Sequence, residues 1–389
     1  MKTGIVIIPT YNERENIQKV VPALEDIFKK APNWDLGILV VDDTSPDKTY
    51  DAVMDLQKKY KNLHLFVNKK KSGLGGAYLK GMDQAFHHLN ADVVFEFDAD
   101  LSHDPLKIPE FLKKIDEGYD MVLGSRYIAG GGIPQDWGWH RKLLSVWGNF
   151  FINVVLADFR IRDWTGGYRA ITKPVYDAVI KDMQSERFTG YTFQIGFLHK
   201  AVQRNFKIAE VPFHFVDRTI GESKMGMDYI KNSLIFILKV RAKDIMSNRL
   251  FKFVVVGGLG ATIQFIALFL FSKVTSFLVA DFFAIEIAIL SNFLINNSWT
   301  FSDRKLRLAE YPIHFLKFNI ASAGSIIIQL IVAFVGKSLF GTGNLFFIPV
   351  VGTGFSLKYV YAGVGILLGM IWNFFAYNTF IWRKTKTKS

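Results

Sequence analysis

Two aspartates, Asp98 and Asp100, stand one residue apart at the end of an apolar run, and His103 follows three residues later. Side chains at positions i and i+2 project to the same face of a strand, so we expect the two carboxylates to converge. Converging carboxylates repel each other unless a cation lies between them, and paired oxygen ligands suit Mg²⁺ or Mn²⁺ rather than zinc. The pair therefore predicts a metal site for substrate phosphates. The alternative is a polar strand end at which each aspartate caps a turn.

Strand and helix patterns alternate in the first half of the chain. Apolar, β-rich runs occur at Gly4–Ile8, Leu36–Val41, Leu63–Val67 and Val93–Phe97, and helical spacing follows each of the first three. This alternation predicts a parallel sheet with crossover helices, and ligands of such sheets bind at the carboxyl ends of the strands. Several strand ends here carry acids or glycines, which favours the metal site over the caps: Asp42-Asp43, Gly73-Leu74-Gly75 and Asp98.

Other kinds of site are excluded by missing residues. The chain has no G-x-x-x-x-G-K-S/T phosphate loop, and Gly73-Leu74-Gly75-Gly76 lacks the G-x-G-x-x-G spacing. A D-x-D whose first aspartate is a phosphotransferase nucleophile belongs on the first strand, whereas this pair lies several strands in. With 0 cysteines, the chain has no disulfides, thiolate zinc sites or thiol catalysis.

Beyond Met246 the sequence changes to long uncharged stretches, which predicts a membrane domain. Four stretches are long and apolar enough to span a bilayer, at about 253–272, 282–301, 318–336 and 359–382. A fifth, Ser338–Leu357, contains several glycines and Pro349, and we interpret it as an outer loop or re-entrant segment. The predicted domains are thus 1–225, a linker at 226–248 and a four-helix membrane domain at 249–389.

The membrane half contains an internal repeat. Phe251-Lys252-Phe253 is echoed by Leu316-Lys317-Phe318, and Ser291-Asn292-Phe293 is echoed by Trp372-Asn373-Phe374. The repeated unit is a two-helix hairpin used twice.

Basic residues exceed acidic ones by 47 − 35 = 12, so we expect acidic partners: lipid headgroups, nucleotide phosphates or nucleic acid. Basic clusters precede the first span, fill the middle loop and close the chain. Four spans place all three on one side of the membrane, which the positive-inside rule makes cytoplasmic. Charge gathered at the membrane argues against nucleic acid as a partner.

Two further stretches, Leu143–Leu156 and Met227–Met246, are apolar and aromatic. We predict that they form helices lying on the membrane surface. Buried core helices have the same composition and remain the alternative.

The motifs of the first half together resemble the family 2 glycosyltransferases of GT-A fold, and within them the dolichol- and polyprenyl-phosphate mannose synthases. The resemblance covers roughly residues 1–225 in the family's order and rests on seven segments: Ile5–Glu13, Asp42–Asp47, Gly73–Gly75, Asp98–His103, Gly124–Tyr127, Trp164–Arg169 and Arg218…Lys224. The membrane half resembles the four-helix domain fused to some archaeal and bacterial members. The motif Asp98–His103 followed by Asp104-Pro105 resembles the mannose branch more than the glucosyl branch.

The resemblance implies an inverting, metal-dependent transfer of mannose from GDP-mannose to a polyprenyl phosphate, and the distribution of basic residues predicts that this reaction takes place at the cytoplasmic face of the cell membrane. It assigns Asp98, Asp100 and Arg126 to catalysis, and Mg²⁺ or Mn²⁺ to Asp98, Asp100 and Ser102. Ser102 stands where members often have glutamine, so its contact would pass through water, and His103 is a weaker candidate. The implied donor-nucleotide residues are Pro9, Tyr11, Glu13, Val41, Asp43, Gly73 and Ala99. The implied lipid-phosphate residues are Arg126, Arg141, Arg169, Arg218 and Lys224.

Residue chemistry alone leaves alternatives to these assignments. Tyr11 also suits a protein core, while Glu13, Asp43 and Asp47 also suit helix caps. No residue stands out as a general base, and none is required, because a phosphate monoester is largely dianionic at neutral pH. Transfer from a UDP-sugar is the second hypothesis for the reaction. The third is a lipid translocator whose first half only senses a nucleotide.

Overall fold

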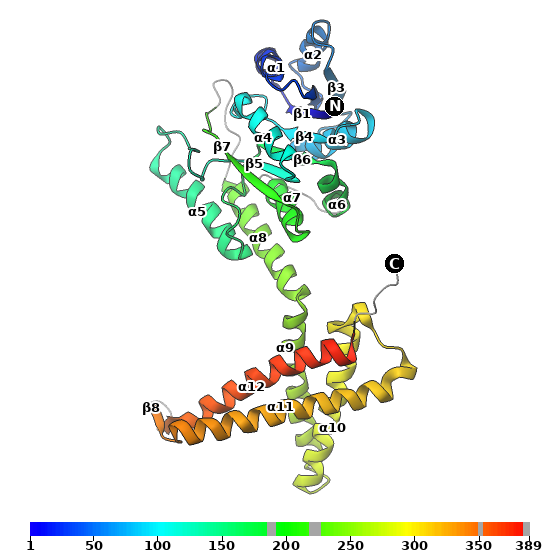
Figure 1. Cartoon of the computed structure of the whole chain (residues 1–389), viewed down its shortest axis with the longest axis vertical. Helices are drawn as coiled ribbons and strands as arrows, with labels where there is room; N and C mark the ends of the chain where they lie inside the picture. Colours follow the sequence, from blue (N-terminus) through cyan, green and yellow to red (C-terminus); the bar gives the residue numbers. More distant parts are fainter. Residues whose placement is uncertain (185–191, 218–226, 349–352, 384–389) are drawn as a thin grey trace. The chain divides into compact units, whose positions relative to one another are not determined.

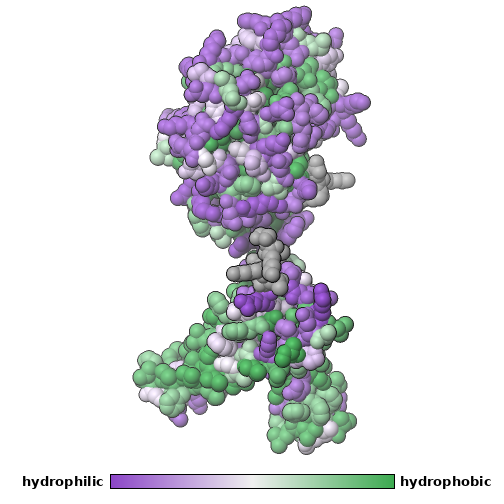
Figure 2. All heavy atoms as spheres, turned by 45° about the vertical axis from the view of Figure 1, so that its right-hand side comes forward, coloured by the Kyte–Doolittle hydropathy of each residue, from purple (hydrophilic) through white to green (hydrophobic). Residues whose placement is uncertain are grey.

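The computed structural model describes residues 1–184, 192–217, 227–348 and 353–383. The chain forms two compact units, Met1–Arg241 and Ala242–Ser389. Their division falls inside helix α8 (Met227–Ser247), which extends through the predicted linker. Figure 2 shows polar side chains over the surface of the first unit and hydrophobic ones over the helices of the second.

The first unit is built on a seven-stranded sheet in the order β3-β2-β1-β4-β6-β5-β7 (Figure 1). Its strands are β1 (Lys2–Thr10), β2 (Trp34–Asp42), β3 (Leu63–Val67), β4 (Val93–Glu96), β5 (Met121–Ser125), β6 (Arg169–Thr172) and β7 (Ile208–Pro212). All neighbouring strands pair in parallel except β6, which is antiparallel to both β4 and β5. The mostly parallel sheet confirms the predicted α/β fold.

Helices cover both faces of this sheet because successive strand residues point to opposite sides. Ile5 and Ile7 pack into one core cluster with α3 (Gly73–His88) and α7 (Thr192–Gln203), while Val6 and Ile8 pack into the other with α1 (Arg14–Phe28) and α4 (Ile108–Asp116). The helices of this unit are α1 (Arg14–Phe28), α2 (Thr49–Gln57), α3 (Gly73–His88), α4 (Ile108–Asp116), α5 (Trp139–Leu156), α6 (Lys173–Gln184) and α7 (Thr192–Gln203), followed by α8.

The two predicted surface helices each have apolar side chains both in the core and on the surface. Helix α5 buries Ile152 and Leu156 and exposes several large apolar side chains, among them Trp139, Trp147 and Phe150. Helix α8 buries Ile237 in the core cluster of α3 and α7 and leaves other apolar side chains exposed. Both helices thus combine a core-facing side with an exposed apolar side.

The second unit consists of two helix hairpins. The first joins α9 (Arg249–Phe271) to α10 (Phe277–Ile295), and the second joins α11 (Tyr311–Phe340) to α12 (Leu357–Ala376). These four helices are the ones in the described part of the chain that are long and apolar enough to cross a membrane. The predicted spans marked the apolar centres of these helices. We predicted the start of α11 seven residues too late, because polar residues in its first turns lower the hydropathy there.

The stretch that we interpreted as an outer loop contains a short antiparallel pair, β8 (Asn344–Ile348) and β9 (Thr353–Ser356). It joins α11 to α12, and residues 349–352 lie outside the described residues.

The internal repeat is also a structural repeat. Each hairpin ends in a π-helical turn, at Asn296–Thr300 and at Tyr377–Ile381. The two turns are offset by 377 − 296 = 81 residues, the same offset as between Asn292 and Asn373, since 373 − 292 = 81. Next to these turns, the rings of Phe301 and Trp382 stack with centroids 4.4 Å apart in the aromatic core between the hairpins.

Candidate active site

The candidate site lies at the carboxyl edge of the sheet, where β1, β2 and β4 end side by side. Pro9 of β1 pairs with Val41 of β2, and Val41 is fully buried. Asp42 ends β2 as a buried residue, and its carboxylate accepts hydrogen bonds from Thr10 Oγ1 (2.9 Å) and Ser45 N (2.8 Å). These bonds fix the loops after β1 and β2 against each other.

Asp98 and Asp100 lie in the turn that follows β4, because this strand ends at Glu96. The rule that alternate strand residues share a face therefore does not apply to these two carboxylates. Hydrogen bonds within and next to the turn fix their positions instead. The Asp98 carboxylate accepts from Tyr78 Oη (3.1 Å), and the Asp100 carboxylate accepts from the backbone N of Ser102 (3.0 Å). Both aspartates remain partly exposed. Asp100 thus caps its turn, as the alternative interpretation required, while both carboxylates stay accessible.

His103 is buried next to this turn and contacts Asp98. Its ring is 3% exposed and stacks on Tyr168 with centroids 4.8 Å apart. Its Nδ1 accepts from the backbone N of Asp98 (3.1 Å), and its Nε2 lies 3.7 Å from the Asp98 carboxylate. Burial lowers the pKa of His103 and favours the neutral ring. In this structure the ring therefore contacts Asp98 from the buried side of the turn.

The donor set at this turn suits a hard divalent cation that also binds substrate phosphates. Among the described residues, no group of three or more His, Asp or Glu side chains forms a metal cage. Mg²⁺ does not need such a cage, since it is commonly held by one or two carboxylates, several waters and the phosphates of a substrate. Asp98 and Asp100 meet this requirement. Ser102 is buried, and its backbone N supports Asp100, so its predicted water-mediated role stays a prediction.

Residues predicted to bind the donor nucleotide lie after β1, β2 and β4, among other positions. Lys71 Nζ lies 3.3 Å from the centroid of the Tyr11 ring, which is partly exposed. Glu13 immediately precedes α1, and its carboxylate accepts from Asn16 Nδ2 (2.6 Å) in the first turn of that helix. Ala99, between the two aspartates, is buried. Tyr11 thus lies beside the cation of Lys71, just after the carboxyl end of β1.

Asp43 holds the start of α3. Its carboxylate accepts from the backbone N of Ser72 and of Gly73, both at 3.0 Å, and also from the Asn68 side chain. Gly73 has a φ of +70°, a left-handed conformation that glycine adopts without strain. The helix-cap alternative for Asp43 is thus realised in this structure. Asp47 likewise accepts from the backbone N of Thr49 (3.0 Å) at the start of α2.

Two of the arginines predicted to bind lipid phosphate form bidentate salt bridges. Arg126 bonds Asp163 through Nε (2.7 Å) and Nη2 (2.8 Å), with 10% of its side chain exposed. Arg141 bonds Asp217 through both terminal nitrogens at 3.0 Å, and its guanidinium lies 3.7 Å from the centroid of the Trp137 ring. Arg126 is thus largely covered, whereas Arg141 is more exposed. Arg218 and Lys224 lie outside the described residues.

Arg169 is fully buried, which does not fit its predicted contact with a lipid phosphate. Its guanidinium donates to three backbone carbonyls, those of Trp164 (3.1 Å), Gly166 (2.9 Å) and Gln194 (2.7 Å). Its Nε also lies 3.8 Å from the carboxylate of Glu96, its partner in the β4–β6 pairing. In this structure Arg169 therefore holds the loop before β6 and the start of α7 together.

Glu96 and Asp163 belong to this polar interior, although the sequence analysis singled out neither. Burial raises the pKa of Glu96 to about 7, and the charge of Arg169 opposes this rise. The Arg126 guanidinium and its hydrogen bonds overcome the opposite effect of burial and lower the pKa of Asp163. Both acids lie next to predicted motifs, Glu96 before Asp98 and Asp163 before Trp164. That adjacency is the only signal of them in the sequence.

Comparison with known proteins gives matches to both halves of the chain. The family described as Glycosyl transferase family 2 matches residues 5–179, and the GtrA/DPMS transmembrane domain matches residues 252–382. A dolichol-phosphate mannosyltransferase of Pyrococcus furiosus is 33% identical over 332 residues, 85% of this chain and 89% of that protein. A polyprenol monophosphomannose synthase of Mycolicibacterium smegmatis is 36% identical over 231 residues, 59% of this chain and 83% of that protein. Among solved structures, mannosyl-3-phosphoglycerate synthase from Rubrobacter xylanophilus aligns with a TM-score of 0.45 and 16% identity, over 63% of this chain and 74% of that chain.

Proposed function

This chain belongs to the dolichol- and polyprenol-phosphate mannosyltransferases of glycosyltransferase family 2, and we propose that it moves mannose from GDP-mannose to a polyprenyl phosphate. The observation that carries the proposal is the pair Asp98 and Asp100, held accessible at the carboxyl edge of a mostly parallel sheet. This is where such sheets bind their ligands.

Asp98 and Asp100 would hold a Mg²⁺ or Mn²⁺ ion against the diphosphate of the donor. When bound, the ion neutralises the negative charge that grows on the leaving nucleoside diphosphate. Tyr78 and His103 keep Asp98 in position, since one bonds its carboxylate and the other its backbone N. Tyr11, Glu13 and Asp43 lie on the loops that would contact the nucleoside.

The acceptor supplies its own nucleophile. An oxygen of the phosphate dianion attacks the anomeric carbon, the bond from that carbon to the GDP oxygen breaks, and GDP leaves with the electron pair. Attack from the face opposite the leaving group inverts the anomeric centre. No proton has to be removed from a phosphate monoester, because its second pKa is near 6. The chain must instead bring two anions together.

Arg126 and Arg141 are the described cations that we assign to this task. A guanidinium carries five N–H donors, so a bidentate contact with Asp163 or Asp217 is compatible with a further bond to a phosphate oxygen. Each carboxylate would fix its arginine in one orientation. Arg218 and Lys224 keep their predicted role as phosphate ligands. We assign Arg169 a positioning role, because it is buried and bonded to backbone carbonyls.

The chain is a membrane protein, and we place its catalytic unit on the cytoplasmic side. Four spanning helices would place the three clusters of basic residues on one side of the membrane, and the positive-inside rule assigns that side to the cytoplasm. The exposed apolar face of α5, with Trp139, Trp147 and Phe150, would dip into the membrane interface near the lipid phosphate.

The test compares labelled GDP-mannose with labelled UDP-glucose as donors to a short polyprenyl phosphate, using the purified full-length protein. We expect label to enter the organic-extractable lipid from GDP-mannose. Transfer from UDP-glucose instead would move the protein to the glucosyl branch. The absence of transfer from both donors would refute the proposed function.

A further inference from the structure

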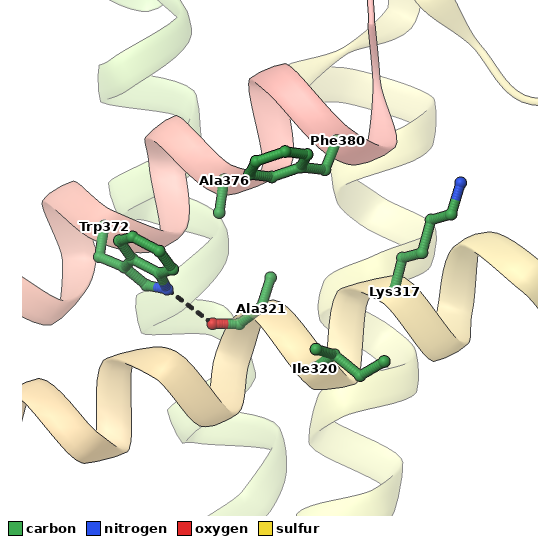
Figure 3. Close-up of a pocket in the computed structure, with 6 residues that line it drawn as sticks. All are labelled: Lys317, Ile320, Ala321, Trp372, Ala376 and Phe380. Carbon is green, nitrogen blue, oxygen red and sulfur yellow. Dashed lines mark hydrogen bonds between the residues drawn. The ribbon is translucent and has the colours of Figure 1, made fainter.

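A groove opens on the second helix hairpin, between α11 and α12 (Figure 3). It encloses about 310 Å³, at the small end of the range for ligand pockets. Its small residues, Ala321 and Ala376, are buried, whereas Ile320 and Phe380 are each 64% exposed. Lys317 and Trp372 complete the lining. The lining of the groove is therefore apolar except for Trp372 Nε1 and one cation, Lys317.

The position of Trp372 is fixed by two features of α11. Its indole Nε1 donates to the backbone carbonyl of Ala321 (2.9 Å), as Figure 3 shows. One turn further along α11, a Cβ at Gly324 would lie 2.4 Å from the same nitrogen, so only glycine leaves room for the ring. Glycine and alanine along α11 thus create both the seat of the indole and the space beside it.

The repeat-related positions of the first hairpin carry larger side chains. The offsets 317 − 252 = 65 and 373 − 292 = 81 relate Ala321 to Val256 and Ala376 to Ile295, so larger side chains replace both alanines. The same offsets relate Lys317 and Phe380 to Lys252 and Trp299, and Lys252 Nζ lies 5.9 Å from the Trp299 ring centroid. In the first hairpin the equivalent lysine therefore lies beside an aromatic ring of the same hairpin.

Lys317 is exposed, and its Nζ forms no hydrogen bond or ion pair with any residue that the structure describes. It lies in the second turn of α11, at the end of the hairpin that follows the basic loop with Arg304, Lys305 and Arg307. An ammonium group at the end of an apolar groove on a membrane helix is complementary to a lipid with a negatively charged head.

We propose that this groove binds one acyl chain of an anionic phospholipid, whose phosphate pairs with Lys317. A bulk membrane lipid fits better than the proposed polyprenyl phosphate substrate. The phosphate of the proposed acceptor is assigned to two arginines, Arg126 and Arg141, whereas this groove offers a single lysine. One cation beside an apolar surface suits the anionic lipids that surround a membrane helix. This proposal does not depend on the transfer reaction.

The test counts phosphatidylglycerol molecules that stay bound to the full-length protein in native mass spectrometry, with phosphatidylcholine as the neutral comparison. Lys317→Gln keeps the length of the side chain and removes its charge, and Lys317→Arg restores the charge. Lys252→Gln is the matched control at the equivalent position of the first hairpin. We expect Lys317→Gln to weaken phosphatidylglycerol binding about fivefold, which corresponds to about 1 kcal/mol for one basic residue beside an anionic headgroup.

Lys317→Arg and Lys252→Gln should bind phosphatidylglycerol like the wild type. Three results would overturn the proposal. Equal losses in Lys317→Gln and Lys252→Gln would show a general surface charge effect. Equal binding of phosphatidylcholine would remove the role of the charge. Displacement of phosphatidylglycerol by an equal concentration of a short polyprenyl phosphate would make the groove an acceptor site.

Discussion

Replacing Arg169 by methionine tests whether this buried guanidinium holds the catalytic fold or binds a ligand. The change removes the donors to the backbone carbonyls of Trp164, Gly166 and Gln194. Each buried acceptor left without a donor costs about 1–3 kcal/mol, so the three together cost about 3 kcal/mol or more. Glu96 also loses its cation, but with a pKa of about 7 it can take up a proton and become neutral. The lost carbonyl bonds therefore dominate the cost.

Thermal unfolding of the full-length protein in detergent measures this loss. For a unit of the size of Met1–Arg241, 1 kcal/mol shifts Tm by about 2–4 °C, so about 3 kcal/mol predicts a fall of about 6–12 °C. Glu96→Gln is the matched control, since it changes the same buried pair but removes only a charge that is partly neutralised already. We expect it to shift Tm by less than about 4 °C. An Arg169→Met variant that has the same Tm as the wild type and loses only affinity for the lipid phosphate would refute this reasoning.

Three further perturbations test other parts of the structure. Asp43→Ala removes the carboxylate that accepts from Ser72 N and Gly73 N, so we expect it to cost about 1–2 kcal/mol in thermal unfolding; an unchanged Tm would argue against the cap. Gly324→Ala should lower the free energy of unfolding by about 1–3 kcal/mol in the same thermal unfolding measurement, because the added Cβ meets the Trp372 indole. Gly258→Ala is the control and should cause no loss of stability, because its added Cβ meets nothing within 4 Å. The chain has no cysteine, so Trp147→Cys on α5 and, as the control, Asp55→Cys on α2 can each carry a single fluorophore. We expect brominated lipids to quench the label on α5 but not the label on α2. Equal quenching of the two labels would contradict membrane contact by α5.

The order of strands and helices was predictable because burial leaves a period in the sequence. Apolar runs marked β1 to β4, and uncharged stretches marked the four membrane helices. The position of β6 was not predictable. Its four residues, Arg169–Thr172, enter the sheet antiparallel between β4 and β5, and only tertiary pairing with Glu96 and its neighbours fixes them there. The start of α11 was missed because hydropathy marks where a helix is apolar, not where it begins.

The candidate site was predictable where one short motif supplies the chemistry, as with Asp98 and Asp100. The partners of the arginines were not, because their contacts join residues far apart in the sequence. Arg126 meets Asp163, and Arg141 meets Asp217, across 37 and 76 positions. The burial of Arg169 has the same cause: a basic residue within a functional motif shows its charge in the sequence but not its depth in the fold.

The most direct test of the central claim is mannose transfer from labelled GDP-mannose to a short polyprenyl phosphate, measured in EDTA and after addition of Mg²⁺ or Mn²⁺. Asp100→Asn removes one proposed metal ligand, and Asp104→Asn is the control, because that side chain caps the turn at Leu106. We predict that wild type and Asp104→Asn transfer mannose only with metal, and that Asp100→Asn loses nearly all transfer while keeping its Tm. Transfer by the wild type in EDTA, or full transfer by Asp100→Asn, would contradict the metal site at Asp98 and Asp100.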